Sequence, residues 1–397
     1  MGGTRIAVQI DAVAQEGFDH DDGRSLEDKA LGFLRIVSTQ KKIWQLMNAE
    51  SLLTVGDWVQ LEVTPKHDAD GPWVWSLQLR DNRLIGDEAT KRPAKGKLVS
   101  IKRLSSGSPL IDPQPLGASV PIAHAKGSAL KKRFSLSNVA PTITPAAINT
   151  YLRKWSRVWG VSCAEALDVG QASFNVISPT FRKGPLLYFD VGQPIWFHIH
   201  NAPPNFSPPC TRSGLVILSH WDTDHYAFGR QNPVFHEKTW IAPAQSSVGP
   251  NANYFANLLQ NKSRLYLVGQ GKSSRHRRGA RVIRCNGTSI NGSGLALHLR
   301  KCGRDILFTG DADYHEIPSV SRIQFSSLQI PHHGGKIAIP SITPRGGTNP
   351  SKAVISCGFP NRYGHPHSSS IIKHLNSDWK IEVTAGWRGV SRGNCKY

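Results

Sequence analysis

The sequence has no uninterrupted apolar run approaching the roughly 18 residues that a membrane-spanning helix needs. Its N-terminus also lacks the apolar segment of a secretory signal, because Asp11 and Glu16 follow a short apolar stretch. The six cysteines include no CxxC pair, which argues against a zinc ribbon and provides no disulfide framework. These absences predict a soluble cytoplasmic protein with reduced thiols and no membrane partner.

Acidic residues are scarce, with 28 Asp and Glu against 48 Lys and Arg, which gives a net charge of +20. Residues 1–150 hold 19 basic and 16 acidic residues, a net charge of +3, whereas residues 151–397 hold 29 and 12, a net charge of +17. A field of this sign concentrates polyanions, and nucleic acid is the usual one. A basic composition that serves only solubility is the alternative explanation.

The composition divides the chain into three parts. Residues 1–88 predict a small β-rich module, OB-like or SH3-like, with strands at 5–10, 58–63 and 73–79 and a hairpin between the last two. Trp73 and Trp75 could stack on bases there, although alternating tryptophans are more often core residues. Residues 89–155, rich in Lys, Pro, Gly and Ser, predict a basic linker, and residues 156–397 predict a second, larger domain.

The segment from His220 to His225 places four metal-binding side chains within six residues: His220, Asp222, Asp224 and His225. It follows the apolar run Leu215 to Leu218, so a strand that ends in this turn would direct two imidazoles and two carboxylates to one point. Such a set of ligands binds divalent cations. Solvated loop residues are the alternative interpretation of the segment taken alone.

Three further segments place His or Asp just after a short β-like run. Asp311 follows Ile306 to Phe308, the pair His332-His333 follows Leu328 to Ile330, and His365 and His367 lie near the C-terminus. We expect these strand ends to converge on one edge of a sheet and to complete a metal site.

In these motifs the chain resembles the metallo-β-lactamase superfamily, and within it the soluble hydrolase domain of ComEC-type DNA-uptake competence proteins. The resemblance covers roughly residues 160 to 390 and includes, in order, Leu167-Asp168-Val169-Gly170-Gln171, Leu187 to Gly192, His220 to His225, Asn291 to Leu295, Leu307 to Asp311, Pro331 to Gly334 and Tyr363 to His367. It implies an α/β (α+β) fold, a four-layer αββα sandwich with metal at the loop edge between two sheets.

The resemblance also implies ligand roles. His220 and Asp222 would bind one metal ion, Asp224 and His225 a second, and Asp311 would bridge the two. His332 is the preferred ligand of its pair, with His333 as a further ligand or phosphate contact. Asp168 and Asp190 would orient the motif loop by accepting backbone hydrogen bonds, with ordinary turn residues as the alternative.

The sequence departs from the common superfamily pattern in two ways. Asp222 stands where most members have a second His, and no clear His occupies the separate third-ligand position of the first metal. We therefore expect one or two divalent ions. A ligand set of carboxylates and imidazoles without thiolate favours manganese, with zinc an alternative and magnesium allowed.

Basic side chains near these motifs predict contacts with substrate phosphates. The basic segment, which we define as Arg275, Arg277, Arg278 and Arg281, interrupts the hydrolase domain between the first metal motif and Asp311. Lys336 follows the His-His-Gly-Gly turn. His365 is predicted either to protonate the leaving group or to contact a phosphate, with a structural role as the alternative.

These observations predict a metal-dependent nuclease, with DNA as the favoured substrate, that hydrolyses phosphodiester bonds through a metal-bound hydroxide. Asp222 or Asp224 would hold the attacking water as a base. Two alternatives stay open. One is a metallo-hydrolase of a small phosphodiester or another small substrate, and the other is a non-catalytic protein that binds nucleic acid or a partner and has a degraded metal site.

Overall fold

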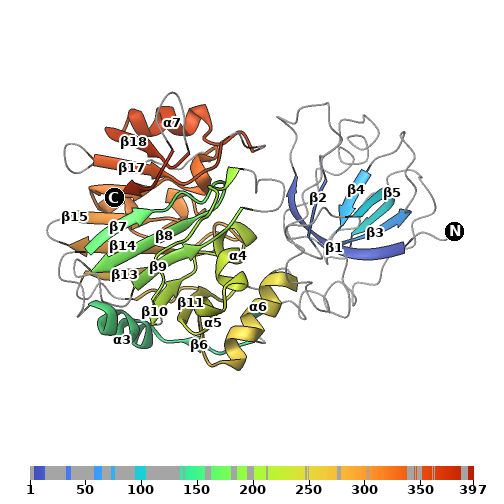
Figure 1. Cartoon of the computed structure of the whole chain (residues 1–397), viewed down its shortest axis with the longest axis horizontal. Helices are drawn as coiled ribbons and strands as arrows, with labels where there is room; N and C mark the ends of the chain where they lie inside the picture. The colour runs from blue at the N-terminus through green and yellow to red at the C-terminus, as the bar shows by residue number, and fades with distance from the viewer. Residues whose placement is uncertain are drawn as a thin grey trace. The chain divides into compact units, whose positions relative to one another are not determined.

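A computed structural model gives the fold of the chain (Figure 1). Within residues 1–134 it describes the backbone of five strands. It also describes residues 135–397, except for 137–138, 157–161, 180–185, 195–200, 212, 246–247, 249, 275–278, 302–303, 338–343, 345, 347–350, 360, 362 and 386–391. The chain divides into two compact units, one of residues 1–138 with 246–254 and one of residues 139–245 with 255–397.

The first unit contains a five-stranded sheet in the order β2-β1-β3-β5-β4. Its strands are β1 (Thr4–Val13), β2 (Phe33–Ile36), β3 (Trp58–Thr64), β4 (Trp73–Ser76) and β5 (Ala94–Arg103). β1, β3 and β4 lie where the sequence predicts strands. Whether the module is OB-like or SH3-like, and how Trp73 and Trp75 are used, stay predictions.

The expected hairpin between β3 and β4 is wrong, because β5 lies between them and pairs antiparallel with both. β5 also falls inside residues 89–155, the range predicted as a linker. The Lys and Gly residues of this range obscure three apolar residues, Leu98, Val99 and Ile101, which suit a strand. The domain limits themselves stay a prediction.

The second unit contains an eight-stranded sheet in the order β19-β7-β8-β9-β10-β11-β12-β6. The strands are β6 (Thr142–Ile143), β7 (Ser162–Ala166), β8 (Phe174–Pro179), β9 (Leu186–Val191), β10 (Gly214–Ile217), β11 (Thr239–Pro243), β12 (Leu265–Val268) and β19 (Cys395–Lys396). From β9 to β6 the neighbours are parallel, and β9 and β10 are buried throughout, as expected for parallel strands covered on both faces.

A six-stranded sheet in the order β13-β14-β15-β16-β17-β18 packs against the eight-stranded sheet of the same unit. The strands are β13 (Ala280–Arg284), β14 (Leu295–Lys301), β15 (Arg304–Phe308), β16 (Ser327–Gln329), β17 (Ser351–Ile355) and β18 (Trp379–Val383). β15 to β18 are parallel, so the loops that follow β15, β16 and β17 leave the same edge of the sheet.

Alternate side chains of the strands divide the core into layers. Leu187 and Phe189 of β9 belong to the same buried cluster as Leu297 and Phe308 of the second sheet, whereas Tyr188 faces the other way. Such alternation follows from the two-residue period of a strand. The core between the two sheets is therefore built from one face of each.

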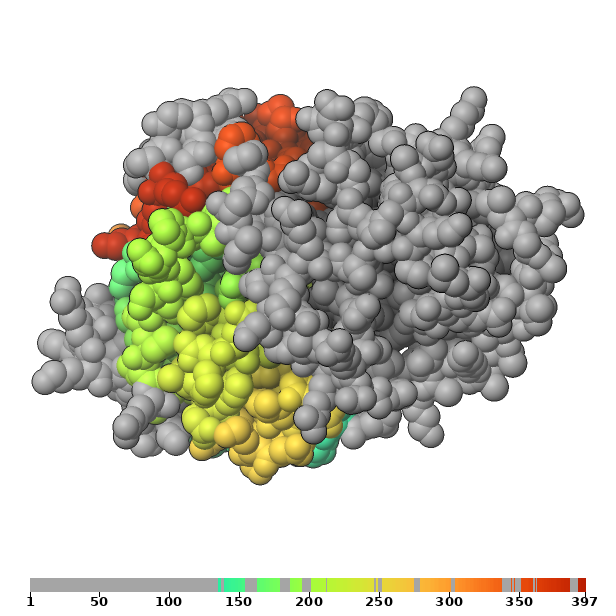
Figure 2. All heavy atoms as spheres, turned by 45° about the vertical axis from the view of Figure 1, so that its right-hand side comes forward, coloured from blue at the N-terminus to red at the C-terminus, as the bar shows by residue number. Residues whose placement is uncertain are grey.

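Helices and short 3-10 turns surround the two sheets, and some of them cover the outer faces. They are α3 (Pro145–Ser156), α4 (Thr223–Gln231), α5 (Pro233–His236), α6 (Pro250–Asn261), α7 (Ser368–Leu375), η4 (Tyr314–Glu316), η5 (Val320–Arg322) and η6 (His332–Gly334). Phe235 of α5 contacts the ring of Tyr188 on the outside of the eight-stranded sheet. Ile371 of α7 joins the buried cluster on the outside of the six-stranded sheet. The predicted αββα sandwich is confirmed, and Figure 2 shows α4 and α5 on its surface in yellow-green.

Five of the six cysteines lie in described positions, and all five are free thiols, as predicted. Among the helices that the structure describes, none combines the length and apolarity that crossing a membrane requires. The cytoplasmic location stays a prediction.

A polar network crosses the core between the two sheets. The hydroxyl of Tyr397 donates to Asn175 Oδ1 at 2.8 Å, and the Asn175 amide donates to Phe189 O at 3.1 Å and Ser173 Oγ at 3.3 Å. Gln329 donates to the same Ser173 hydroxyl at 3.1 Å. The network joins β8, β9 and β16 below the loop edge, so it fixes one sheet relative to the other.

We expect Tyr397→Phe to lower the free energy of unfolding by about 1–3 kcal/mol, because it leaves Asn175 Oδ1 buried without its donor. Chemical denaturation with and without the substitution measures the change. Lys396→Ala is the control, since the Lys396 side chain is exposed and should alter stability by less than about 0.5 kcal/mol. Equal stability of Tyr397→Phe and the unsubstituted chain would show that the network adds nothing.

Candidate metal centre

The His220–His225 segment lies where the sequence predicts it, between the end of β10 and the start of α4. Asp222 is the N-cap residue of α4 by its extended backbone, but its carboxylate does not cap the helix. It lies instead 3.4 Å from His220 Nε2. Asp224 and His225 fall in the first turn of the helix, where both are buried. The turn thus directs its polar side chains to one side.

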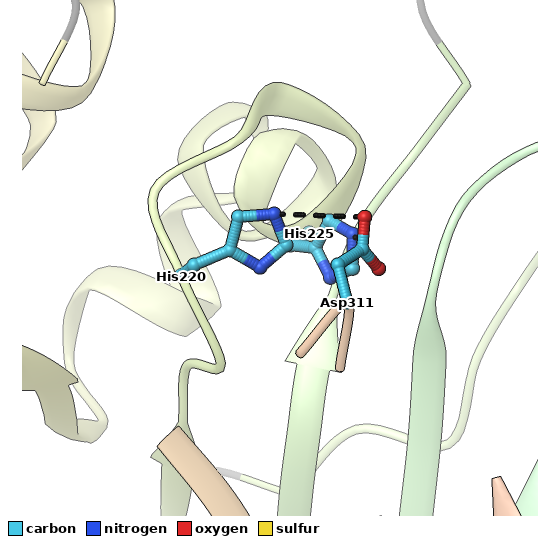
Figure 3. A group of neighbouring side chains, drawn as sticks. All are labelled: His220, His225 and Asp311. Carbon is cyan, nitrogen blue, oxygen red and sulfur yellow. Dashed lines mark ion pairs between the residues drawn. The ribbon is translucent and has the colours of Figure 1, made fainter. Parts of the chain in front are cut away.

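Asp311 is the centre of the group. Its carboxylate lies 3.2 Å from His225 Nε2 and 3.8 Å from His220 Nε2 (Figure 3). It also lies 3.3 Å from His332 Nδ1 and 3.8 Å from His333 Nε2. The loops after β10, β15 and β16 therefore converge, as the sequence predicts.

The turn that carries Asp311 requires glycine at position 310. Gly310 has a φ of +59°, and a Cβ atom there would lie 2.4 Å from the Cβ of Ser219. A left-handed backbone and this close approach both exclude a side chain. The two loops can meet at this distance only because residue 310 is glycine.

His333 has the better geometry of its pair, although the sequence favours His332. The His333 ring is buried, its Nδ1 donates to Ser356 O at 2.7 Å, and its Nε2 lies 3.4 Å from the Asp224 carboxylate. The side chain of His332 is 44% exposed, and its Nδ1 lies 3.1 Å from the amide of Asn291. Both histidines have φ near +50°, so adjacent residues project in different directions. The geometry therefore favours His333, and the choice of ligand between the two stays a prediction.

Hydrogen bonds at Nδ1 fix which nitrogen each buried histidine presents. His225 Nδ1 lies 2.8 Å from the Asp190 carboxylate, which can only accept. The Ser219 hydroxyl donates its one proton to Asp190 at 2.9 Å and so accepts from His220 Nδ1 at 3.0 Å. His333 Nδ1 is bonded to a backbone carbonyl. In the neutral rings, all three therefore turn an unprotonated Nε2 toward Asp311.

These residues fit a divalent cation. The Nε2 atoms of His220, His225 and His333 are buried and make no hydrogen bond. Buried nitrogens without such bonds are costly unless a cation or proton occupies the space between them. Two overlapping groups have ligand atoms within 4.8 Å of one another, His220 with His225 and Asp311, and Asp224 with His225 and His333. Asp222 is near the first group through His220.

The electrostatics of the group are those of a cation site. Burial raises the pKa of Asp311, but the surrounding histidines, His225 first, hold it well below its usual range. Burial lowers the pKa of His225, but Asp311 and Asp190 outweigh burial and hold it well above its usual range. Protons therefore compete with a metal ion for His225 Nε2.

The two predicted supporting carboxylates have different roles. Asp190, with a φ of +57°, accepts from Ser219 N at 2.7 Å and contacts His225, so it orients the motif loop as predicted. Asp168 accepts from Gly170 N at 3.2 Å and from Arg392 Nη2 at 2.8 Å. Asp168 thus orders its own loop and the C-terminal segment instead of the His220–His225 turn.

The predicted substrate contacts lie partly outside the described residues. His365 is at the site, with its ring centroid 5.3 Å from that of His332. Lys336 is exposed and Arg281 is half-buried. Arg275, Arg277 and Arg278 lie outside the described residues.

Sequence reasoning missed three polar residues of the site: Ser219, Ser356 and Gln171. Ser219 directly precedes His220, which is a usable signal because a hydroxyl there can reach the carboxylate at the end of β9 and the imidazoles of the motif. Gln171 lies in the motif Leu167 to Gln171, but the pattern assigns it no role. Ser356 contributes its backbone carbonyl, for which side-chain patterns carry no signal.

No family model matches the chain, and no curated protein sequence matches it. Similar solved structures include a variant of CmlA beta-hydroxylase, at 11% identity and a TM-score of 0.34 over 59% of this chain and 53% of that one. The metallo-beta-lactamase fold protein YhfI from Bacillus subtilis is 10% identical, with a TM-score of 0.33 over 60% of this chain and all of that one. Zn(2+)-bound PqqB from Methylobacterium extorquens is 10% identical, with a TM-score of 0.31 over 57% of this chain and 87% of that one. The chain thus spans about half the length of CmlA beta-hydroxylase.

We expect His333→Ala to weaken zinc and manganese binding by more than about 10-fold, because it removes a buried and oriented nitrogen. His332→Ala, at the exposed neighbour, should weaken binding less. Isothermal titration of the metal-free protein measures both affinities, and circular dichroism checks that both variants fold. A larger loss in His332→Ala would return the ligand role to His332.

Proposed function

We propose that the protein is a metal-dependent hydrolase that cleaves phosphodiester bonds in nucleic acid, with DNA as the favoured substrate. The three buried Nε2 atoms around Asp311 are the observation that supports the proposed metal dependence. His220, His225, Asp311, Asp224 and His333 would hold one or two divalent ions. When bound, such an ion polarises a phosphoryl oxygen and lowers the pKa of water.

The metal identity is a proposal from the donor set. Imidazole nitrogens and carboxylate oxygens without thiolate suit manganese and zinc, and magnesium less well. His220, His225 and His333 each have a partner at Nδ1, which holds the ring in place for an ion. Both groups include His225, whose Nε2 has one lone pair and would bind only one ion, so if two ions bind, Asp311 would be the ligand that they share.

The residues of the chain have separate tasks in this proposal. Asp222, whose carboxylate lies 3.4 Å from His220 Nε2, would accept a proton from the attacking water. Asp224 is buried and lies 3.4 Å from His333 Nε2, so it suits a ligand. Asp190 and Ser219 hold His220 and His225 in orientation.

The choice of a nucleic-acid substrate rests on charge. Residues 151–397 carry a net charge of +17, and five of their twelve acidic residues, Asp168, Asp190, Asp222, Asp224 and Asp311, are buried or half-buried at the motifs. The remaining surface is more basic than the net charge implies, which favours a polyanion. The resemblance to ComEC-type hydrolase domains in the same motifs points to DNA.

We expect the protein to cleave single-stranded or duplex DNA in the presence of manganese or zinc, and Asp224→Asn to lose at least about 100-fold of this activity. The substitution keeps the size of the side chain and removes the charge that a cation needs. Gel assays with DNA, RNA and a chromogenic phosphodiester, with and without a chelator, measure cleavage.

The other results of this assay identify the alternatives. Turnover of only the chromogenic ester would replace the nuclease with a hydrolase of small phosphodiesters. Nucleic-acid binding without turnover under every metal would indicate a binding protein.

We expect the basic segment to bind the polymer. Neutralising Arg275, Arg277, Arg278 and Arg281 together should weaken DNA binding and flatten its salt dependence, while hydrolysis of a small phosphodiester changes little. The control neutralises four exposed residues, Arg304, Arg322, Lys380 and Lys396. Their neutralisation removes the same amount of positive charge. Equal losses in both quadruple variants would mean that net charge, and not this segment, attracts DNA.

A further inference from the structure

His365 is held at the metal centre by contacts to its backbone and to its ring. Asn361 Oδ1 accepts from His365 N at 3.0 Å, and Asn361 Nδ2 donates to His365 O at 2.5 Å. The ring stacks on Tyr363 with centroids 5.4 Å apart and an interplanar angle of 25°. The imidazole therefore has a defined position before any substrate arrives.

Gln171, which is buried, contacts the Nδ1 atom of His365 at 3.4 Å through its side-chain Nε2. The other end of the Gln171 amide is fixed, because its Oε1 accepts from Gly358 N at 3.2 Å. A backbone N–H can only donate, so the oxygen of the amide must face Gly358 and the NH2 group must face His365. The direction of the hydrogen bond to Nδ1 follows from this.

An amide NH2 group can only donate, so His365 Nδ1 must accept. A neutral imidazole has one proton, and here that proton is on Nε2. His365 is thus the opposite of His220, His225 and His333, which donate at Nδ1 and present an unprotonated Nε2. An Nε2–H group does not bind a metal ion, which separates His365 from the ligands.

The Nε2 edge of His365 faces the turn that follows His333. A Cβ atom at Gly335 would lie 3.0 Å from His365 Nε2, so the turn approaches this edge closely because residue 335 is glycine. The His365 ring is nearly parallel to that of His333, at 18° and a centroid distance of 6.4 Å. The N–H group therefore lies beside the candidate metal centre.

We propose that Gln171 is a positioning residue that holds His365 as a neutral Nε2–H hydrogen-bond donor, and that this donor binds a non-bridging oxygen of the substrate phosphoryl group. No proton is transferred. Of the two roles predicted for His365, the hydrogen bond from Gln171 favours phosphate contact over leaving-group protonation, since it opposes a second proton at Nδ1. The phosphoryl acceptor rests on the proposed function, whereas the tautomer does not.

The tautomer is measured by long-range proton–nitrogen NMR of the 15N-labelled full chain, with the His365 signals assigned by their loss in His365→Gln. We expect a bare Nδ1 and a protonated Nε2. In Gln171→Glu the carboxylate accepts but cannot donate, so a proton should appear on Nδ1. Gln270→Glu, an exposed position that makes the same charge change, is the control and should leave these signals unchanged. A protonated Nδ1 in the unsubstituted chain would overturn the proposal.

The phosphate contact is tested by comparing His365→Gln and His365→Ala on two substrates. One releases nitrophenolate, a good leaving group, and the other is a dinucleotide that releases an alkoxide. We expect His365→Ala to lose about 10- to 100-fold in kcat/KM on both, and His365→Gln to recover part of it, because an amide donates a hydrogen bond without transferring a proton. A much larger loss on the dinucleotide would overturn the contact in favour of acid catalysis. If the unsubstituted chain cleaves neither substrate, the proposed function and the phosphate contact fail together, while the NMR result still decides the tautomer.

Discussion

The structure of the site depends on the burial of one carboxylate, that of Asp311, among histidines from two other loops. A buried anion costs several kcal/mol unless opposite charge compensates it. In the absence of metal, protons on the surrounding imidazoles supply that charge, and they hold the pKa of Asp311 well below its usual range. A divalent cation would replace those protons, so the same packing that favours charged histidines favours metal.

This constraint extends into the scaffold. The loops after β10 and β15 must approach closely for Asp311 to reach His220 and His225, and Gly310 permits the approach. Ser219 N bonded to Asp190 joins the end of β10 to the end of β9, and the Tyr397–Asn175 bond fixes the sheets below. A change in sheet packing would move His220 and His225 relative to Asp311. The core network therefore also maintains the geometry of the site.

Sequence patterns predicted the parts of this site that follow from strand periodicity. Short apolar runs followed by His or Asp identified the ends of β10, β15 and β16, because parallel strands bring their C-terminal ends to one edge. The patterns could not decide between His332 and His333, since that depends on two consecutive left-handed residues. They also missed β5, where lysines flank a few apolar residues, and the contact of Asp168 with Arg392, which is more than two hundred residues away.

The groups that form hydrogen bonds with Nδ1 of each histidine decide whether its Nε2 carries a proton. Asp190, Ser219 and the Ser356 carbonyl accept a hydrogen bond, so the rings they hold offer a lone pair at Nε2. The amide of Gln171 donates, so the ring of His365 offers a proton instead. Four imidazoles of the same intrinsic chemistry are thereby divided into three that present a lone pair at Nε2 and one that presents a proton there. Because this division needs only the direction of a hydrogen bond, a substitution at a supporting residue can change the role of a histidine while leaving its position unchanged.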